Sequence, residues 1–533
     1  ASPQVRSAFL DRSSAEAVFS VLSDVFVEVQ DRSGHDPKVR IDTEDAGTSV
    51  LTVAPDQPFL VDTVLLTLRN CEVPYRSGFN LVVGIGRNAD GRLTSIDGKG
   101  DDLESLVYVD ADTTDPDSLQ ENRAALHTGL RLAQATVKDF HRITSRVDQA
   151  AHQLARMADR QGEAADVFRE SAAFLRWLLS DNFVFMSATQ GDDRLGIANE
   201  DLSAVWLADV NVDWCDNDDR LIRVRKSGTE SRVHRAGRTD LIRVELPDES
   251  GDGTEALILQ GLFTYRAVTQ PSRHVPLLRQ RMNRILTTQD SKPSSYRYKG
   301  ITNVFDSLPT EFLFTAESTE IAEMIDRVLE AEQERQARVH LIQRPTDATT
   351  FVLVAMPRGH WSEQRRLSIQ NALIYGTGAS YCDHGVFVGR YDTMLVHYYL
   401  TGASELSEAE ITELASGITE LATSWKDRIH AALTHRFEAP QADALIRRYG
   451  TAFEDIYIRQ TSSEQTVRDI EILEALNEEN PVRVDFFIDD RGRANLRVYQ
   501  LHNIVLSEML PVLEHFGLVV LDQFADPIAP DDA

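Results

Sequence analysis

A chain of 533 residues is too long for a single hydrophobic core, and it predicts roughly three to five domains of about 100–200 residues each. Its 84 acidic and 55 basic side chains leave a net charge of −29, which argues against a nucleic-acid partner because such proteins need a basic surface. No apolar run approaches the ~18 residues that a membrane span requires, so we expect no membrane partner.

The cysteines and the first residues indicate the cellular compartment. Cys71, Cys215 and Cys382 are few and far apart, which excludes a disulfide framework and a cysteine-based zinc site. The first residues lack the basic stretch followed by an apolar stretch that marks a signal peptide. Sparse cysteines fit a reducing environment, so we expect a cytoplasmic protein.

The first predicted elements form a compact unit of strand, helix and strand. A helical pattern over residues 14–29 precedes this unit. Residues 48–53 have strand composition, and apolar residues then recur at helical spacing over residues 60–70. Residues 79–86 alternate as a strand does. A β–α–β unit this compact must bury one face of its helix on a sheet.

The remainder of the first predicted domain, residues 1–150, holds a hairpin, a strand and a long helix. Asp90-Gly91 between two short apolar runs predicts the hairpin, and residues 103–109 predict the strand. Residues 119–147 contain no proline and predict one uninterrupted helix. Residues 151–162 are polar and alanine-rich, which predicts a helical link to the next domain.

A helix followed by consecutive strands defines the second predicted domain, residues 151–336. The helix lies at 164–179 and is broken at Asp181-Asn182. Six strands follow, at 183–188, 221–224, 231–234, 241–246, 256–259 and 262–268. This spacing predicts one antiparallel sheet with helices on one side. Three further helices are predicted at 274–286, 298–308 and 319–337.

Three more domains complete the prediction. Residues 337–404 form a small α+β module with strands at 339–342, 351–355, 385–388 and 394–399 and a helix at 363–373. Residues 405–478 form a helical connector with helices at 406–437, 443–457 and 464–476. Residues 479–533 form a last α+β module. Its first two predicted strands lie at 482–488 and 495–499, around a turn at 489–492. A helix at 506–516 ends at Gly517, and a further strand follows at 518–521. A tail rich in Pro and Asp covers 525–533.

Motifs that would carry chemistry fail their context tests. Gly84-Ile-Gly86 follows a strand but leads into a hairpin instead of a helix, so it does not predict a dinucleotide loop. Gly376-Thr-Gly378 follows a helix and fails in the same way. Cys382-Asp383-His384 has no further ligands at metal spacing, so we interpret it as part of a loop. We therefore predict no catalytic, cofactor-binding or metal-binding residues in this chain.

The turn at 54–58 is the best candidate for ligand binding. A turn from a strand into a helix presents backbone N–H groups and the positive end of the helix dipole to a carboxylate. In small regulatory β–α–β domains, amino acids bind at such turns, often between two copies. The alternative is structural: Asp56 or Gln57 caps the helix and Pro58 occupies its first turn.

A second candidate lies between two predicted strands. His234, Arg235, Arg238 and Asp240 mix both charges at strand ends, as an anion pocket for a small carboxylate would, although an ordinary solvated hairpin is the explanation that the sequence favours. The candidate effector-binding residues from both stretches are Asp56, Gln57, Asp62, Arg235 and Arg238.

Several stretches together resemble the N-terminal, non-catalytic region of the large bacterial NAD-dependent glutamate dehydrogenases. They are Pro58-Phe-Leu-Val-Asp-Thr63, the helix-to-strand passage Phe174-Leu-Arg-Trp-Leu-Leu-Ser-Asp-Asn-Phe-Val-Phe185, Ser231-Arg-Val-His-Arg235 with Asp240, Gly261-Leu-Phe-Thr264, Val275-Pro-Leu-Leu-Arg279, and Leu506-Ser-Glu-Met-Leu-Pro-Val-Leu-Glu-His-Phe-Gly-Leu518. The stretches run in the family's order and span nearly the whole chain. At Phe185-Met-Ser-Ala-Thr189 the chain departs from the family, which more often has Gly-Tyr after the strand.

The resemblance implies a multidomain α+β fold with several ACT-like βαβ modules plus a PAS-type antiparallel-sheet domain, joined by helical connectors. The family's enzymes oxidise L-glutamate with NAD, form homo-oligomers and respond to amino-acid effectors. Their catalytic domain follows the resembling region, so NAD belongs to the parent enzyme and we expect no cofactor within this segment. We expect the segment to regulate and to oligomerise through its ACT-like modules. A free-standing amino-acid-sensing protein built from the same modules is the alternative.

Overall fold

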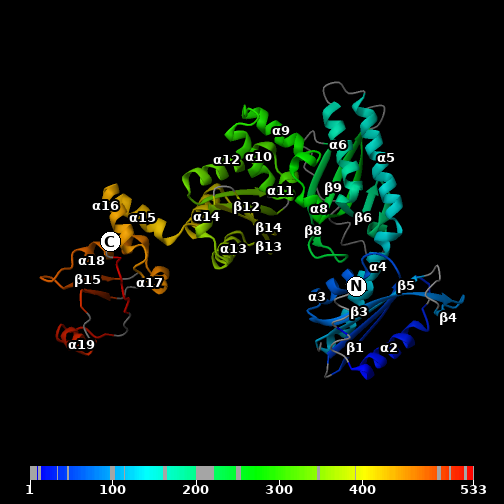
Figure 1. Ribbon diagram of the computed structural model, residues 1–533, viewed down its shortest axis with the longest axis horizontal. Coiled ribbons are helices and arrows are strands. Elements are labelled where there is room, and N and C mark those ends of the chain that lie inside the picture. Colours follow the sequence, from blue (N-terminus) through cyan, green and yellow to red (C-terminus); the bar gives the residue numbers. More distant parts are fainter. Residues whose placement is uncertain are drawn as a thin grey trace. The chain divides into compact units, whose positions relative to one another are not determined.

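The chain divides into two compact units, Ala1–Ala322 and Glu323–Ala533, in the computed structural model (Figure 1). The structure describes residues 9, 14–32, 34–44, 47–96, 103–112, 115–159, 165–199, 221–247, 254–344, 348–389, 392–488, 494–502, 506–520 and 525–531. Within these residues, no helix combines the length and the apolar character needed to cross a membrane. Cys215, one of the three cysteines, falls outside them.

The first unit begins with a five-stranded antiparallel sheet in the order β1-β2-β5-β3-β4. Its strands are β1 (Lys38–Glu44), β2 (Gly47–Pro55), β3 (Tyr75–Arg87), β4 (Leu93–Ile96) and β5 (Leu103–Ala111). Three helices belong to it: α2 (Ala15–Val29), α3 (Leu60–Asn70) and α4 (Leu119–Lys138). The predicted unit at 48–86 is therefore confirmed as β2–α3–β3, and β5 lies between its two strands.

Both faces of this first sheet are buried. Val107 and Val109 of β5 pack with α3 and α4 side chains such as Leu68 and Leu130. Leu106, on the opposite face of β5, packs in a second core with Val25 of α2. Because neighbouring residues of a strand point to opposite faces, a strand buried on both sides must be apolar throughout. That constraint explains the apolar run Leu106-Val-Tyr-Val109 in the middle of β5.

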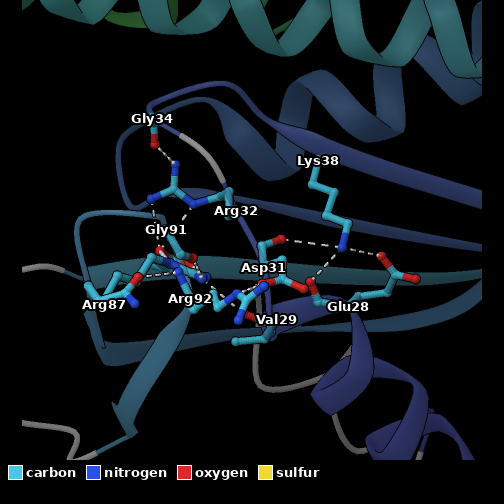
Figure 2. A network of polar contacts seen from close by, with 11 residues as sticks. Glu28, Val29, Asp31, Arg32, Gly34, Lys38, Arg87, Gly91 and Arg92 are labelled. Carbon is cyan, nitrogen blue, oxygen red and sulfur yellow. Dashed lines mark hydrogen bonds and ion pairs between the residues drawn. The ribbon is translucent and has the colours of Figure 1, made fainter.

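A buried polar network ties α2 and the β3–β4 hairpin to the sheet (Figure 2). Glu104 of β5 has a side chain only 3% exposed, and it receives two arginines. Arg87 donates to its two oxygens at 2.6 and 2.8 Å, and Arg32 donates at 2.8 and 3.1 Å. Arg87 also donates to the carbonyl oxygens of Val29 and Gly91 at 3.0 and 2.8 Å. One carboxylate thereby fixes three separate segments.

The arginines also set the ionisation of Glu104. Burial alone would raise the pKa of this carboxyl group, but the hydrogen bonds from Arg87 and Arg32 outweigh burial and hold the pKa below its ordinary value. The negative charge of Glu104 therefore compensates the positive charges of two nearly buried guanidinium groups. Removing one partner of such a pair leaves the other charges uncompensated.

We expect Glu104→Gln to lower the opening free energy of the first sheet by about 3 kcal/mol at neutral pH, the usual cost of breaking a buried ion pair. Because the folded-state pKa is depressed, the wild-type advantage is full above the unfolded pKa of about 4.3 and disappears as pH falls through the folded value. Hydrogen exchange of residues 103–111 between pH 7 and pH 3 measures this difference in opening free energy between the wild type and the variant. Glu121→Gln, which removes an exposed carboxylate of α4, is the control. A wild-type advantage that stays constant down to pH 3 would contradict this assignment.

A second antiparallel sheet in the first unit has the order β7-β6-β10-β9-β8. Its strands are β6 (Phe183–Gln190), β7 (Asp193–Gly196), β8 (Ile222–Glu230), β9 (Arg238–Pro247) and β10 (Thr254–Phe263). The helices α5 (Phe140–Ala158) and α6 (Ala165–Trp177) precede it. The predicted break at Asp181 is confirmed, because this residue has a left-handed φ of 59° within the π-helical turn η2 (Leu178–Asn182). The predicted antiparallel sheet is therefore present.

Three predictions in the first unit are wrong in detail. The helix predicted at 119–147 is two helices, because Asp139 ends α4 and accepts a hydrogen bond from the Gly196 N–H at 2.9 Å. Residues 231–234 form a loop instead of a strand. The strands predicted at 256–259 and 262–268 are one strand, β10, followed by the short helix α8 (Tyr265–Thr269).

The helices α9 (Leu278–Thr288), α10 (Tyr296–Ser307) and α11 (Thr310–Thr315) follow the second sheet, and α12 (Ser318–Glu334) leads into the second unit. Phe314 of α11 stacks on Phe263 at the end of β10, with ring centroids 5.3 Å apart. Trp177 of α6 contacts both rings. This aromatic cluster joins the helices to the sheet.

The second unit holds a four-stranded antiparallel sheet in the order β11-β12-β14-β13. The strands are β11 (Arg338–Arg344), β12 (Thr349–Pro357), β13 (Tyr381–Val388) and β14 (Thr393–Thr401), and α13 (Glu363–Thr377) and α14 (Glu408–Ala422) pack on it. The helical connector consists of α15 (Trp425–Arg436), α16 (Ala439–Tyr449), α17 (Asp455–Gln460) and α18 (Ser463–Glu474). The single helix predicted at 406–437 is therefore divided between α14 and α15.

The last described elements are a hairpin of β15 (Val482–Ile488) and β16 (Ala494–Gln500), then α19 (Leu506–His515). A buried carboxylate, Asp469 of α18, accepts hydrogen bonds from Arg497 and Tyr499 of β16 at 2.9 and 2.7 Å and from Tyr457 of α17. This contact docks the hairpin on the connector. The predicted turn at 489–492 lies outside the described residues, and residues 518–520 are not the predicted strand.

Candidate effector site

The turn that leads into α3 is built by one residue with unusual backbone geometry. Asp56 extends from β2, and its N–H donates to the Leu103 carbonyl oxygen at 2.8 Å. Phe59 precedes the helix with a left-handed φ of 74°, and α3 has no side-chain cap. The capping role predicted for Asp56 or Gln57 is therefore wrong, and Pro58 lies before the helix instead of in its first turn. The positive end of the α3 dipole thus lacks a carboxylate cap.

A loop of the second sheet domain, residues 231–237, meets this turn. His234, with a left-handed φ of 70°, donates its backbone N–H to the Thr63 hydroxyl at 3.3 Å. Its ring nitrogen Nδ1 is hydrogen-bonded to the Asp62 carboxylate at 3.1 Å. The imidazole also packs on Phe59, with ring centroids 5.1 Å apart. The two stretches that the sequence proposed separately are therefore neighbours.

The structure places the other predicted residues around this junction. Arg235 follows His234, is exposed, and donates one N–H to the Phe263 carbonyl oxygen at 2.7 Å. Arg238 begins β9, where its backbone lies opposite that of Glu230 in the neighbouring strand β8. Gln57 is half-buried, and its Nε2 is buried with no hydrogen-bond partner among the residues that the structure describes. Among the five predicted residues, Asp62 makes a hydrogen bond that crosses the junction.

A shared apolar core lies beneath the junction. Leu126 and Leu130 of α4 belong to the core of the first sheet, whereas Leu132 and Ala133 pack with residues of the second. The second-sheet residues in that cluster are Met186, Ile197, Val233 and Leu262, and Phe59 packs against it. One helix therefore contributes to both cores, and the loop at 231–237 is anchored through Val233.

A buried ion triad fixes the strands from which this loop emerges. The Lys226 ammonium group lies 2.9 Å from Asp240 and 2.6 Å from Glu311 of α11. Burial alone would lower the pKa of Lys226, but the charges of Asp240 and Glu311 outweigh burial and raise it, so the lysine stays charged. The other carboxylate oxygen of Asp240 accepts the Phe263 N–H at 3.2 Å. Because Arg235 holds the carbonyl of the same residue, the triad and the site are linked.

The junction combines both signs of charge with a helix N-terminus. Asp62 supplies a carboxylate, Arg235 an exposed guanidinium group, and α3 the positive end of its dipole. An amino acid carries a carboxylate and an ammonium group, so these groups match its two charges. No group of three His, Cys, Asp or Glu side chains among the described residues could hold a metal ion.

The glycine pairs do not fit NAD. Gly84 and Gly86 lie inside β3, and a Cβ atom at Gly86 would meet the Ser95 hydroxyl at 2.4 Å, so no phosphate cradle opens there. Gly378 ends α13 with a left-handed φ of 65°. Cys382 lies on the edge strand β13 instead of in the predicted loop, and burial, together with the nearby Asp383 charge, raises the pKa of its thiol to about 11.

Separate antiparallel sheets joined by helices make this a modular α+β protein, and the family comparison describes its first module as an ACT domain. The chain matches the family descriptions "Glutamate dehydrogenase, ACT1 domain" over residues 4–127 and "Glutamate dehydrogenase, helical motif 1" over 275–335. It also matches "Glutamate dehydrogenase, helical motif 2" over 432–476 and "Glutamate dehydrogenase, ACT3 domain" over 482–533.

Relatives support the same assignment. The NAD-specific glutamate dehydrogenase of Halomonas elongata is 25% identical over 93% of this chain and 33% of its own length. The proteins of that name from Pseudomonas aeruginosa and Mycobacterium tuberculosis are each 23% identical over 90% of this chain, with 31% and 30% of their lengths covered. The chain thus spans about a third of the relatives it matches. It belongs to the family of large NAD-specific glutamate dehydrogenases.

We expect Lys226→Met to destabilise the second sheet by about 3–5 kcal/mol, because it leaves Asp240 buried without its counter-charge. The double variant Lys226→Met/Asp240→Asn should recover most of that loss, since Asn keeps an acceptor for the Phe263 N–H and removes the charge. Hydrogen exchange of β9 and β10 measures both, with Arg232→Met as the exposed control. Equal losses in the single and double variants would show that charge compensation is not the cause.

Proposed function

We propose that this chain is the regulatory and oligomerising segment of a large NAD-dependent glutamate dehydrogenase. The parent enzyme would convert L-glutamate and NAD to 2-oxoglutarate, ammonia and NADH in a catalytic domain that these residues do not include. The observation that carries the proposal is the order of the matched domains, ACT1, helical motif 1, helical motif 2 and ACT3, along one chain. A free-standing sensor is not favoured, because the relatives are about three times as long as this segment.

We further propose the junction of α3 and the 231–237 loop as the site of an amino-acid effector. The effector's carboxylate would contact Arg235, with Arg238 beside it on β9, and its ammonium group would contact Asp62. Asp56 and Gln57 would line the turn, where the buried Nε2 of Gln57 supplies a donor with no partner among the described residues. Because His234 already binds Asp62, an effector would act on the contact between the two sheet domains.

The remaining domain assignments belong to the same proposal. The sheet of β6 to β10 would be a PAS-type domain, and the module at 337–404 a further ACT-like domain between the two matched ones. Five antiparallel strands with helices before and after support the first assignment. A four-stranded antiparallel sheet with α13 and α14 packed on it supports the second. The divisions would then be 1–150, 151–336, 337–404, 405–478 and 479–533.

Homo-oligomerisation through the ACT-like modules is supported by an apolar sheet face. Val484, Phe486 and Ile488 alternate along β15 and are 59%, 57% and 68% exposed. A two-stranded hairpin with one bare apolar face is marginal in water, so this face fits an interface. A cytoplasmic location is part of the proposal, because three widely spaced cysteines suit a reducing compartment.

Calorimetric titration of the chain with each of the twenty amino acids tests the effector site. We expect at least one to bind, and Arg235→Ala to weaken that binding about tenfold or more, because a charge-assisted hydrogen bond contributes about 1.5–3 kcal/mol. Arg232→Ala, at an exposed arginine of the same loop, should leave the affinity unchanged. No heat with any amino acid, or equal losses in the two variants, would contradict the site.

A further inference from the structure

The turn between α9 and α10 gathers positive charge in a strongly acidic protein. Residues 266–299 hold eight Lys or Arg side chains and a single carboxylate, whereas the whole chain carries a net charge of −29. Six of these side chains are exposed, and we call the four nearest the turn, Arg284, Lys292, Arg297 and Lys299, the basic tip. Such a local reversal of sign is the signature of a surface that binds an acidic partner.

Hydrogen bonds close the turn, so the four cations lie at one end of the α9–α10 hairpin. The Ser291 N–H donates to the Leu286 carbonyl oxygen at 3.0 Å, and the Ser295 N–H donates to the Lys292 carbonyl oxygen at 3.1 Å. The Arg297 guanidinium group, at the start of α10, donates to the Gln289 side chain at 3.0 Å. Across the described parts of the chain, Arg284, Lys292 and Lys299 pair with no carboxylate.

The second unit carries a surface of the opposite charge. The outward face of α14 carries Glu408, Glu413 and Glu420. Small side chains, among them Ser416 and Gly417, lie between these glutamates, and α14 contains four glutamates and no Lys or Arg. Small residues allow another element to approach closely, and the glutamates beside them would meet its cations.

We propose that the basic tip of one copy of this chain docks on the acidic face of α14 in a second copy. Two copies with 29 excess negative charges each repel one another, so their association needs a local attraction of this kind. In a two-fold dimer the contact forms twice, because each copy offers both surfaces. Nucleic acid fits the tip less well, because the acidic remainder of the chain repels a phosphate backbone. The proposal does not depend on the effector site.

Charge reversal followed by sedimentation equilibrium of the whole chain tests this contact. We expect Arg284→Glu/Lys299→Glu and Glu413→Lys/Glu420→Lys each to raise the dimer dissociation constant about tenfold or more at low salt. Combining all four substitutions should restore association, because the charges are exchanged and the attraction is kept. Arg459→Glu/Arg468→Glu removes two exposed cations elsewhere and should leave the dissociation constant unchanged.

Several results would overturn the proposal. One is a chain that stays monomeric at every concentration, and another is a dimer that none of the tip or α14 variants weakens. A third is a tip variant that loses binding to a single-stranded oligonucleotide while its association is unchanged, which would assign the tip to nucleic acid. Circular dichroism checks that each variant is folded. Titration calorimetry with amino acids measures binding at the proposed effector site separately.

Discussion

The apolar faces of each sheet must be buried, and the helices that cover these faces determine the architecture. In the sheet of β1 to β5 both faces are buried, one by α2 and the other by α3 and α4. α4 then continues into the core of the next sheet domain through Leu132 and Ala133. Because one helix contributes to two cores, neither sheet domain of the first unit can shift without disturbing the packing of the other. Burial of apolar surface thereby creates a mechanical connection as well as stability.

Three buried charged groups each connect several segments of this chain. Glu104 holds Arg32 and Arg87, and Lys226 lies between Asp240 and Glu311. Asp469 fastens the last hairpin to the helical connector. Each of these groups joins elements far apart in the sequence, which is the role expected of a modular protein whose parts must keep a defined geometry. We propose that the junction at His234 and Asp62 is where a ligand changes the contact between two such domains.

The sequence predicted the elements of this fold better than their ends. The alternation of apolar residues gave β2, α3 and β3, and Asp181-Asn182 marked the end of the helix before β6. The break at Asp139 had no local signal, because its cause is a hydrogen bond to Gly196. Residues 231–234 have strand composition, yet tertiary contacts hold them as a loop, with His234 bound to Asp62 and Thr63.

The candidate site shows the same limit. Asp62 and Arg235 were proposed from separate stretches, and their proximity depends on packing between domains that no local pattern encodes. His234 joins the two stretches, and its imidazole on Phe59 and its left-handed backbone carry no sequence signature. The capping roles of Asp56 and Gln57 failed because Phe59 takes the position before α3 with a left-handed backbone. A helix start without a side-chain cap is a departure that only the structure reveals.

We propose that these residues provide shape, docking surfaces and a ligand site, while the redox chemistry takes place in another part of the family's longer chains. Incubating the purified chain with L-glutamate and NAD and following absorbance at the NADH band tests this proposal. We expect no NADH above the background of a protein-free control. Sustained NADH formation that scales with the concentration of the chain would contradict it.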